Sequence, residues 1–161
     1  MKVTFLSDNL QKKISFLNHA VSSRGQLPIL SNFLLEAKAG KLIISATDLE
    51  IGISSSIPVN VEKEGRTTIP AKNFTDLLSN LGSQKITLVL DGETLRLTGE
   101  KIKASFQTIP SEDFPKLYEE KGEEFVTIKK TQIEKYILRV VFAAAQDSSR
   151  PALSGVLLDK E

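Results

Sequence analysis

Apolar residues in the first half of the chain follow two different spacings. They recur every three or four positions over residues 7–22 and again over residues 70–82, which predicts two helices. The apolar stripe of the first helix consists of Leu10, Ile14, Leu17 and Val21, and that of the second of Phe74, Leu77, Leu78 and Leu81. Each helix is therefore expected to place one face on a core and the other in solvent.

Alternating or continuous apolar stretches fill most of the remaining positions up to residue 107. They are separated by turn residues such as Ala39-Gly40 and Asp91-Gly92. Strands are predicted at residues 2–6, 32–39, 41–48, 50–59, 66–69, 85–90, 94–98 and 102–107. This order predicts an α+β module in which two helices cover one face of an antiparallel sheet.

The chain also matches itself, because residues 124–161 can be laid over residues 1–38 with a constant shift of 123 positions and no gap. Chance would give about two or three identities over such a stretch. Ten are present, at Val3, Thr4, Lys12, Ile14, Ala20, Pro28, Leu30, Ser31, Leu34 and Leu35. The sequence therefore predicts a duplicated domain.

The repeat divides the chain into a complete first domain at residues 1–118, a linker at residues 119–124 and the start of a second, identical domain at residues 125–161. An acidic stretch punctuated by prolines precedes the second copy and is typical of such a linker. In the second copy, residues 125–129 are expected as a strand and Ile133, Ile137, Val140 and Ala144 as the stripe of a helix. Because the first copy continues for about eighty residues beyond the match, we expect a fragment or truncated product of a longer repeat protein.

Composition narrows the class of protein only slightly. The chain has 161 residues, of which 40% are hydrophobic and 25% charged, with a net charge of +1 and no cysteine. These values are ordinary for a globular protein, exclude disulfides and thiolate metal sites, and are compatible with the cytoplasm. They also exclude the bulk basicity of a histone-like binder. The N-terminus turns polar after six residues, so it is neither a signal peptide nor a membrane span.

Cations nevertheless recur at related helical positions. Lys12 and Lys135 occupy the same place in the two copies, off the apolar stripe, and Lys72 begins the second helix of the module. Repeated modules would align these lysines on one helical surface, which suits a phosphate backbone. Only Phe16 is a plausible stacking residue there, and this scarcity of aromatic residues favours duplex over single-stranded nucleic acid.

Residues for catalysis are not apparent. The one histidine, His19, has no recognisable nucleophile beside it, and we expect it to be solvated. Asp48 and Glu50 could bind a divalent metal in a phosphoesterase, but a pair of acids at a turn more often caps backbone amides. We therefore expect no catalytic residues, no metal and no cofactor.

Residues 101–107 form the last predicted strand of the module and place Ile102, Ala104 and Phe106 on one face. These three side chains could simply face the core. Alternatively, the strand is an edge at which a neighbouring subunit continues the sheet.

Five separated motifs resemble the bacterial sliding-clamp family, the beta subunits of DNA polymerase III. They are LPILSNFLLEA, SATDLEIGI, TTIPAKNFTDLL, IPSEDFPKL and FAAAQDSSRPALSGVLL, in the order and spacing of the family and over the whole chain. The resemblance implies a subunit of several similar domains, two of which join head to tail into a ring with sheet outside and helices lining the channel. It also implies a non-catalytic, cytoplasmic processivity factor that encircles duplex DNA, tethers the polymerase and is served by clamp loader subunits.

The resemblance also implies roles for particular residues. Arg24 and Lys72 match positions that contact DNA, and residues 146–151, which include Gln146 and Pro151, overlap a DNA-facing loop. Arg150 and Leu153 match part of the pocket that receives peptides from polymerases and other partners. The first domain's side of the dimer interface corresponds to Leu77, Ala104 and Phe106. Besides a clamp, the residues leave open the metal-dependent phosphoesterase and a structural repeat protein without a nucleic acid role.

Overall fold

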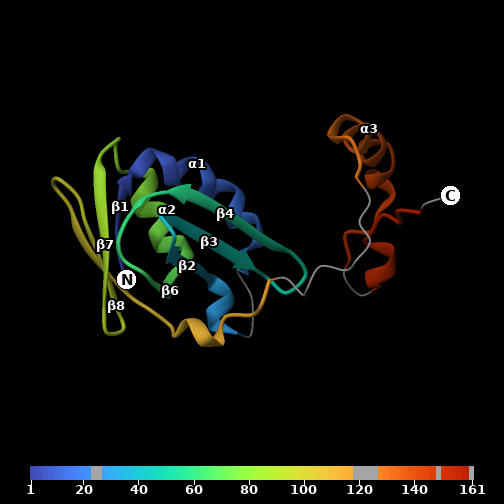
Figure 1. The fold of residues 1–161 in the computed structure, drawn as a ribbon. Coiled ribbons are helices and arrows are strands. Elements are labelled where there is room, and N and C mark those ends of the chain that lie inside the picture. The colour runs from blue at the N-terminus through green and yellow to red at the C-terminus, as the bar shows by residue number, and fades with distance from the viewer. Residues whose placement is uncertain (23–26, 118–126, 148–149, 160–161) are drawn as a thin grey trace. The chain divides into compact units, whose positions relative to one another are not determined.

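A computed structural model describes residues 1–22, 27–117, 127–147 and 150–159 of the chain (Figure 1). It divides into two compact units, Met1–Glu119 and Glu120–Glu161. Within the described residues, no helix is both long and apolar enough to cross a membrane.

The strands of the first unit form two antiparallel sheets rather than one. The four-stranded sheet has the order β4-β3-β2-β6, and the five-stranded sheet has the order β5-β1-β7-β8-β9. The strands are β1 (Lys2–Leu6), β2 (Asn32–Lys38), β3 (Lys41–Thr47), β4 (Gly52–Pro58), β5 (Asn60–Lys63), β6 (Gly65–Pro70), β7 (Lys85–Asp91), β8 (Thr94–Thr98) and β9 (Lys103–Gln107).

Two helices cover one face of the four-stranded sheet. Helix α1 (Ser7–Leu17) contacts β3 and β4, and helix α2 (Ala71–Ser79) contacts β2 and β6 (Figure 1). The predicted α+β class, antiparallel sheet with two helices on one face, is thereby confirmed. Helix α1 ends earlier than predicted, because residues 18–20 tighten into a 3-10 turn.

The core lies between the helices and the sheets. The helix stripes contribute the buried side chains of Leu10, Ile14, Leu17, Phe74 and Leu78. They meet alternate residues of the strands, among them Phe33, Leu35, Leu42, Ile44 and Ile69, all of them fully buried. Burial of one such side chain contributes about 1.5–3 kcal/mol.

The turn between β2 and β3 follows the predicted turn chemistry. Ala39 and Gly40 both have positive φ angles, of 49° and 73°. A two-residue loop with both φ values positive matches the twist of a β-hairpin, and glycine adopts this conformation without steric cost. The Ala39 N–H also donates to Glu64 Oε1 at 2.9 Å, which ties the turn to the start of β6.

Strand β5 was not predicted. The sequence pattern predicts that the preceding strand runs to residue 59, whereas the chain turns after Pro58 and runs back along β1, with Val61 opposite Val3. Only four residues long and mostly exposed, β5 carries too short an alternation to stand out in the sequence.

The segment after β9 is fastened to the first unit. Ile109 exchanges two hydrogen bonds with the side chain of Thr68, and Phe114 is buried in a small cluster with Ile29, Leu30 and Leu34. Farther along, Leu117 packs so closely on Gly52 that a Cβ on this glycine would lie 2.9 Å from Leu117 Cδ2. The chain up to residue 117 thus belongs to the first unit, and the predicted linker at residues 119–124 lies outside the described residues.

The second unit repeats the helical part of the first at the predicted shift. Helix α3 (Lys130–Val140) falls on α1, and the 3-10 turns at Val141–Ala143 and Pro151–Leu153 fall on those at Asn18–Ala20 and Pro28–Ser31. The strand expected at 125–129 is not formed at residues 127–129, and residues 125 and 126 are outside the described part. In the first unit, the equivalent strand β1 is held between β5 and β7.

Candidate nucleic-acid interface

The outward faces of α1 and α2 carry the predicted cations of the first unit. Lys12 and Lys72 are both exposed, because each lies off the apolar stripe of its helix. Lys13, which is not among the predicted DNA-contacting residues, is exposed next to Lys12. The sequence feature that indicates the exposure of Lys13 is its position off the apolar stripe of α1.

Polar contacts join the two helices and help to hold them side by side. The Gln11 side-chain amide donates to the carbonyl oxygens of Leu78 and Leu81, the latter at 3.0 Å. Near the other end of α1, Thr75 Oγ1 donates to Asn18 Oδ1 at 3.2 Å. No pattern in the sequence indicated these contacts, since they join residues more than fifty positions apart.

A depression lies where the end of α1 meets the beginning of α2. Its lining consists of Asn18, Val21, Lys72, Thr75 and Asp76. The lysine lies beside an amide and a hydroxyl, the kinds of group that contact phosphate and sugar oxygens. Asp76 adds an opposing charge, so the depression suits a weak contact rather than a tight phosphate clamp.

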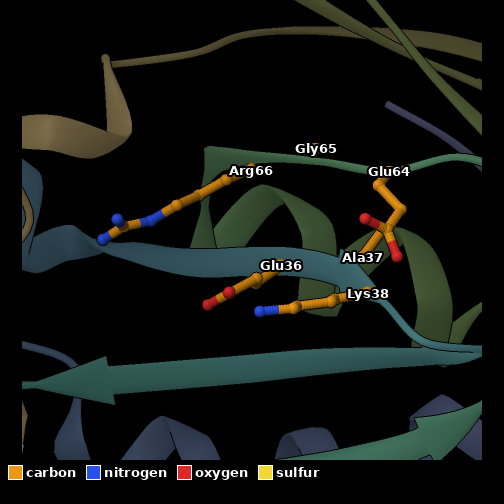
Figure 2. A pocket seen from close by; sticks show the side chains of 6 residues that line it. All are labelled: Glu36, Ala37, Lys38, Glu64, Gly65 and Arg66. Carbon is orange, nitrogen blue, oxygen red and sulfur yellow. The ribbon is translucent and has the colours of Figure 1, made fainter.

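The opposite face of the four-stranded sheet has a different character. A depression there lies between β2 and β6 and is lined by Glu36, Ala37, Lys38, Glu64, Gly65 and Arg66. Figure 2 shows that Glu36 and Lys38 extend from β2 and Arg66 from β6. Two acids and two bases line this depression, which therefore has no excess of positive charge.

The acidic pair considered for metal binding forms a turn. Asp48 Oδ1 accepts the backbone N–H groups of Glu50 at 3.0 Å and Ile51 at 2.8 Å. This is the capping role that a pair of acids at a turn more often has. Throughout the described residues, no group of three or more His, Asp or Glu side chains could hold a metal ion.

The residues assigned to a subunit interface differ in burial. Leu77 and Ala104 are partly buried, whereas Phe106 is only 8% exposed. The ring of Phe106 meets that of Phe74 edge to face, with centroids 5.9 Å apart. Phe106 therefore already serves the core of the first unit, which was the first of the two interpretations of this strand.

The second unit carries its candidate residues on α3 and the segment after it. Lys135 is exposed, as is Lys12 in the first unit, and its Nζ lies 5.9 Å from the centroid of the Tyr136 ring. Gln146 and Arg150 are exposed, and Leu153 lines an apolar depression with Val140 and other residues of the same unit. Pro151 begins a 3-10 turn. Arg24 lies outside the described residues.

Comparisons with known proteins agree on one family. The family model described as DNA polymerase III beta subunit, N-terminal domain, matches residues 1–118. The chain is 34% identical to a beta sliding clamp of Treponema pallidum, covering 99% of this chain and 43% of that protein, and 30% identical to that of Escherichia coli K12, covering 100% and 44%.

Solved structures give the same result. A DNA polymerase III subunit beta of Pseudomonas aeruginosa superposes with a TM-score of 0.89 at 27% identity and covers 96% of this chain and 43% of its own. The chain thus spans less than half the length of the curated relatives that it matches.

Proposed function

This chain belongs to the DNA polymerase III beta subunit family, and from that premise we propose that the protein carrying it is a subunit of a DNA sliding clamp. In this role, a ring of two subunits joined head to tail encircles duplex DNA and tethers the replicative polymerase. Tethering raises the effective concentration of the polymerase at the primer end without any chemistry by the ring. Bacterial replication takes place in the cytoplasm, and we therefore assign the protein to that compartment.

The family match over residues 1–118 carries the proposal. It is supported by the exposed lysines of α1 and α2, which lie on one face of the four-stranded sheet next to polar groups. Phosphate oxygens are contacted by such side chains without regard to base sequence. A few separate lysines allow a clamp to hold DNA and still slide.

We assign DNA contacts to Lys12, Lys72 and, in the second domain, Lys135. The family positions add further assignments: Arg24, Gln146 and Pro151 for DNA, and Arg150 with Leu153 for part of the pocket that receives peptides of the polymerase and of clamp loader subunits. The first domain's side of the ring interface is assigned to Leu77 and Ala104, whereas Phe106, matched to the same interface, packs in the core of the first unit. The domains are assigned to residues 1–118 and 125–161.

Retention on circular DNA tests the clamp itself. The whole protein that carries this chain is loaded on nicked circular duplex and washed, and the circle is then cut once. A ring that encircles DNA slides off the free ends, so cutting should release the protein. Equal retention on circular and linear DNA would mean ordinary surface binding and would refute the proposal.

Charge reversal tests the helical face. Lys12→Glu combined with Lys72→Glu should weaken DNA association and lower the slope of log affinity against log salt by about two, one for each phosphate that is no longer neutralised. The matched control is Lys38→Glu with Lys41→Glu, which changes the charge equally on the other face of the same sheet. Equal effects of the two pairs would show that net charge alone, and not the helical face, governs binding.

A further inference from the structure

One phenylalanine of the first unit is exposed where the others are buried. Phe5, Phe33, Phe74, Phe106 and Phe114 are all at most 8% exposed. Phe16, on α1, is 67% exposed. It lies off the Leu10, Ile14 and Leu17 stripe, so helix packing does not account for it.

The neighbours of Phe16 are cationic. Lys12 lies four residues and Lys13 three residues before it, and side chains at these spacings are neighbours on a helix surface. The ring thus has two exposed lysines as its neighbours on the helix surface.

We infer that Phe16 is a contact site for an unpaired base of single-stranded DNA at a primer-template junction, with the lysines holding the flanking phosphates; this inference rests on the proposed function. A base exposes its π-face to a protein only when it is unpaired and unstacked. A protein beside a duplex instead meets phosphates, sugars and the edges of the bases. An apolar protein partner would meet charged lysines around the ring, and a polyanion meets complementary charge. A single ring suits one base, which agrees with a protein that mainly holds duplex.

The chain itself provides a clean reporter for this contact. It contains no tryptophan, so Phe16→Trp introduces one indole whose fluorescence is quenched when a base stacks on it. The control reporter is Thr98→Trp, at an exposed position of β8 in the five-stranded sheet. Each protein is titrated at low salt with a thymine oligonucleotide, with a blunt duplex and with a junction that has a single-stranded overhang.

We expect the Phe16→Trp signal to be quenched by the oligonucleotide and the junction, and much less by the blunt duplex. Phe16→Ala should lower the affinity for the oligonucleotide about fivefold or more, the loss that follows from removing one base-aromatic stack, and Phe16→Tyr should retain it. Circular dichroism of each variant checks the fold, which substitution at so exposed a position should preserve.

Three results would overturn the inference: no quenching at position 16, equal quenching by the blunt duplex, or equal quenching of the control reporter. Its failure is distinct from failure of the clamp proposal. If cutting the circle releases the protein but the fluorescence of Phe16→Trp is not quenched, only the proposed base contact is refuted. Quenching without topological retention would instead leave a single-strand contact on a protein that is not a clamp.

Discussion

Replacing Thr68 by valine should loosen the segment that leaves the first unit. The Thr68 hydroxyl donates to the Ile109 carbonyl oxygen at 2.8 Å and accepts the Ile109 N–H at 3.0 Å and the Asn32 side-chain amide at 3.0 Å. Thr68 is fully buried, and Asn32 is 5% exposed. Valine has almost the same shape but leaves all three partner groups without this oxygen.

The size of the effect follows from those three bonds. Each neutral hydrogen bond contributes about 1 kcal/mol net, and buried groups left without partners cost at least as much. We therefore expect Thr68→Val to lower the free energy of unfolding of the first unit by about 3 kcal/mol. For a domain of this size, that loss corresponds to a fall of roughly 10 °C in the melting temperature.

Urea denaturation followed by far-UV circular dichroism measures this change, because the strands of the described chain all lie in the first unit. Thr68→Ser keeps the hydroxyl and should retain most of the stability. Thr98→Val, at an exposed position, controls for the substitution itself. A loss below about 1 kcal/mol in Thr68→Val, or an equal loss in Thr68→Ser, would show that these bonds do not hold the segment.

Three further substitutions test other contacts of the first unit by the same denaturation assay. Gly65→Ala should cost about 1–3 kcal/mol, because its Cβ would lie 3.1 Å from a backbone atom of the first residue, whereas Gly82→Ala, with open space around it, should be nearly neutral. Asp48→Ala should cost about 1–2 kcal/mol by removing the turn cap, and Asp48→Asn should cost much less; equal losses would argue against the cap. Phe106→Leu should cost about 1 kcal/mol by removing the edge-to-face contact with Phe74, even at concentrations where the chain is monomeric, and a loss seen only on self-association would assign the ring to an interface.

Local patterns predicted most of the elements of the first unit. Both helices followed from the three-to-four spacing of apolar residues, and the hairpin turn followed from Ala39-Gly40. Those patterns succeed because helix periodicity and turn chemistry depend on residues a few positions apart. Strand β5 was not predicted because its four mostly exposed residues carry little periodicity.

The candidate interface was predictable only in part. The exposure of Lys12 and Lys72 followed from their positions off the apolar stripes. The burial of Phe106 against Phe74 did not, because a strand's apolar face can meet either a core or a partner. Asp48 could likewise have been a ligand or a cap until the turn geometry decided it.

By itself, the sequence determined the repeat, and with it the correspondence of α3 to α1, because a duplicated stretch of chain carries its helix pattern with it. Only the tertiary structure decided that the strands divide into two sheets, and that Thr68 fastens Ile109. Those features depend on hydrogen bonds between residues far apart in the chain, whose pairing is selected by the packing of the whole unit. The same packing left the ring of Phe16 in solvent between lysines while it buried the other phenylalanines of the unit.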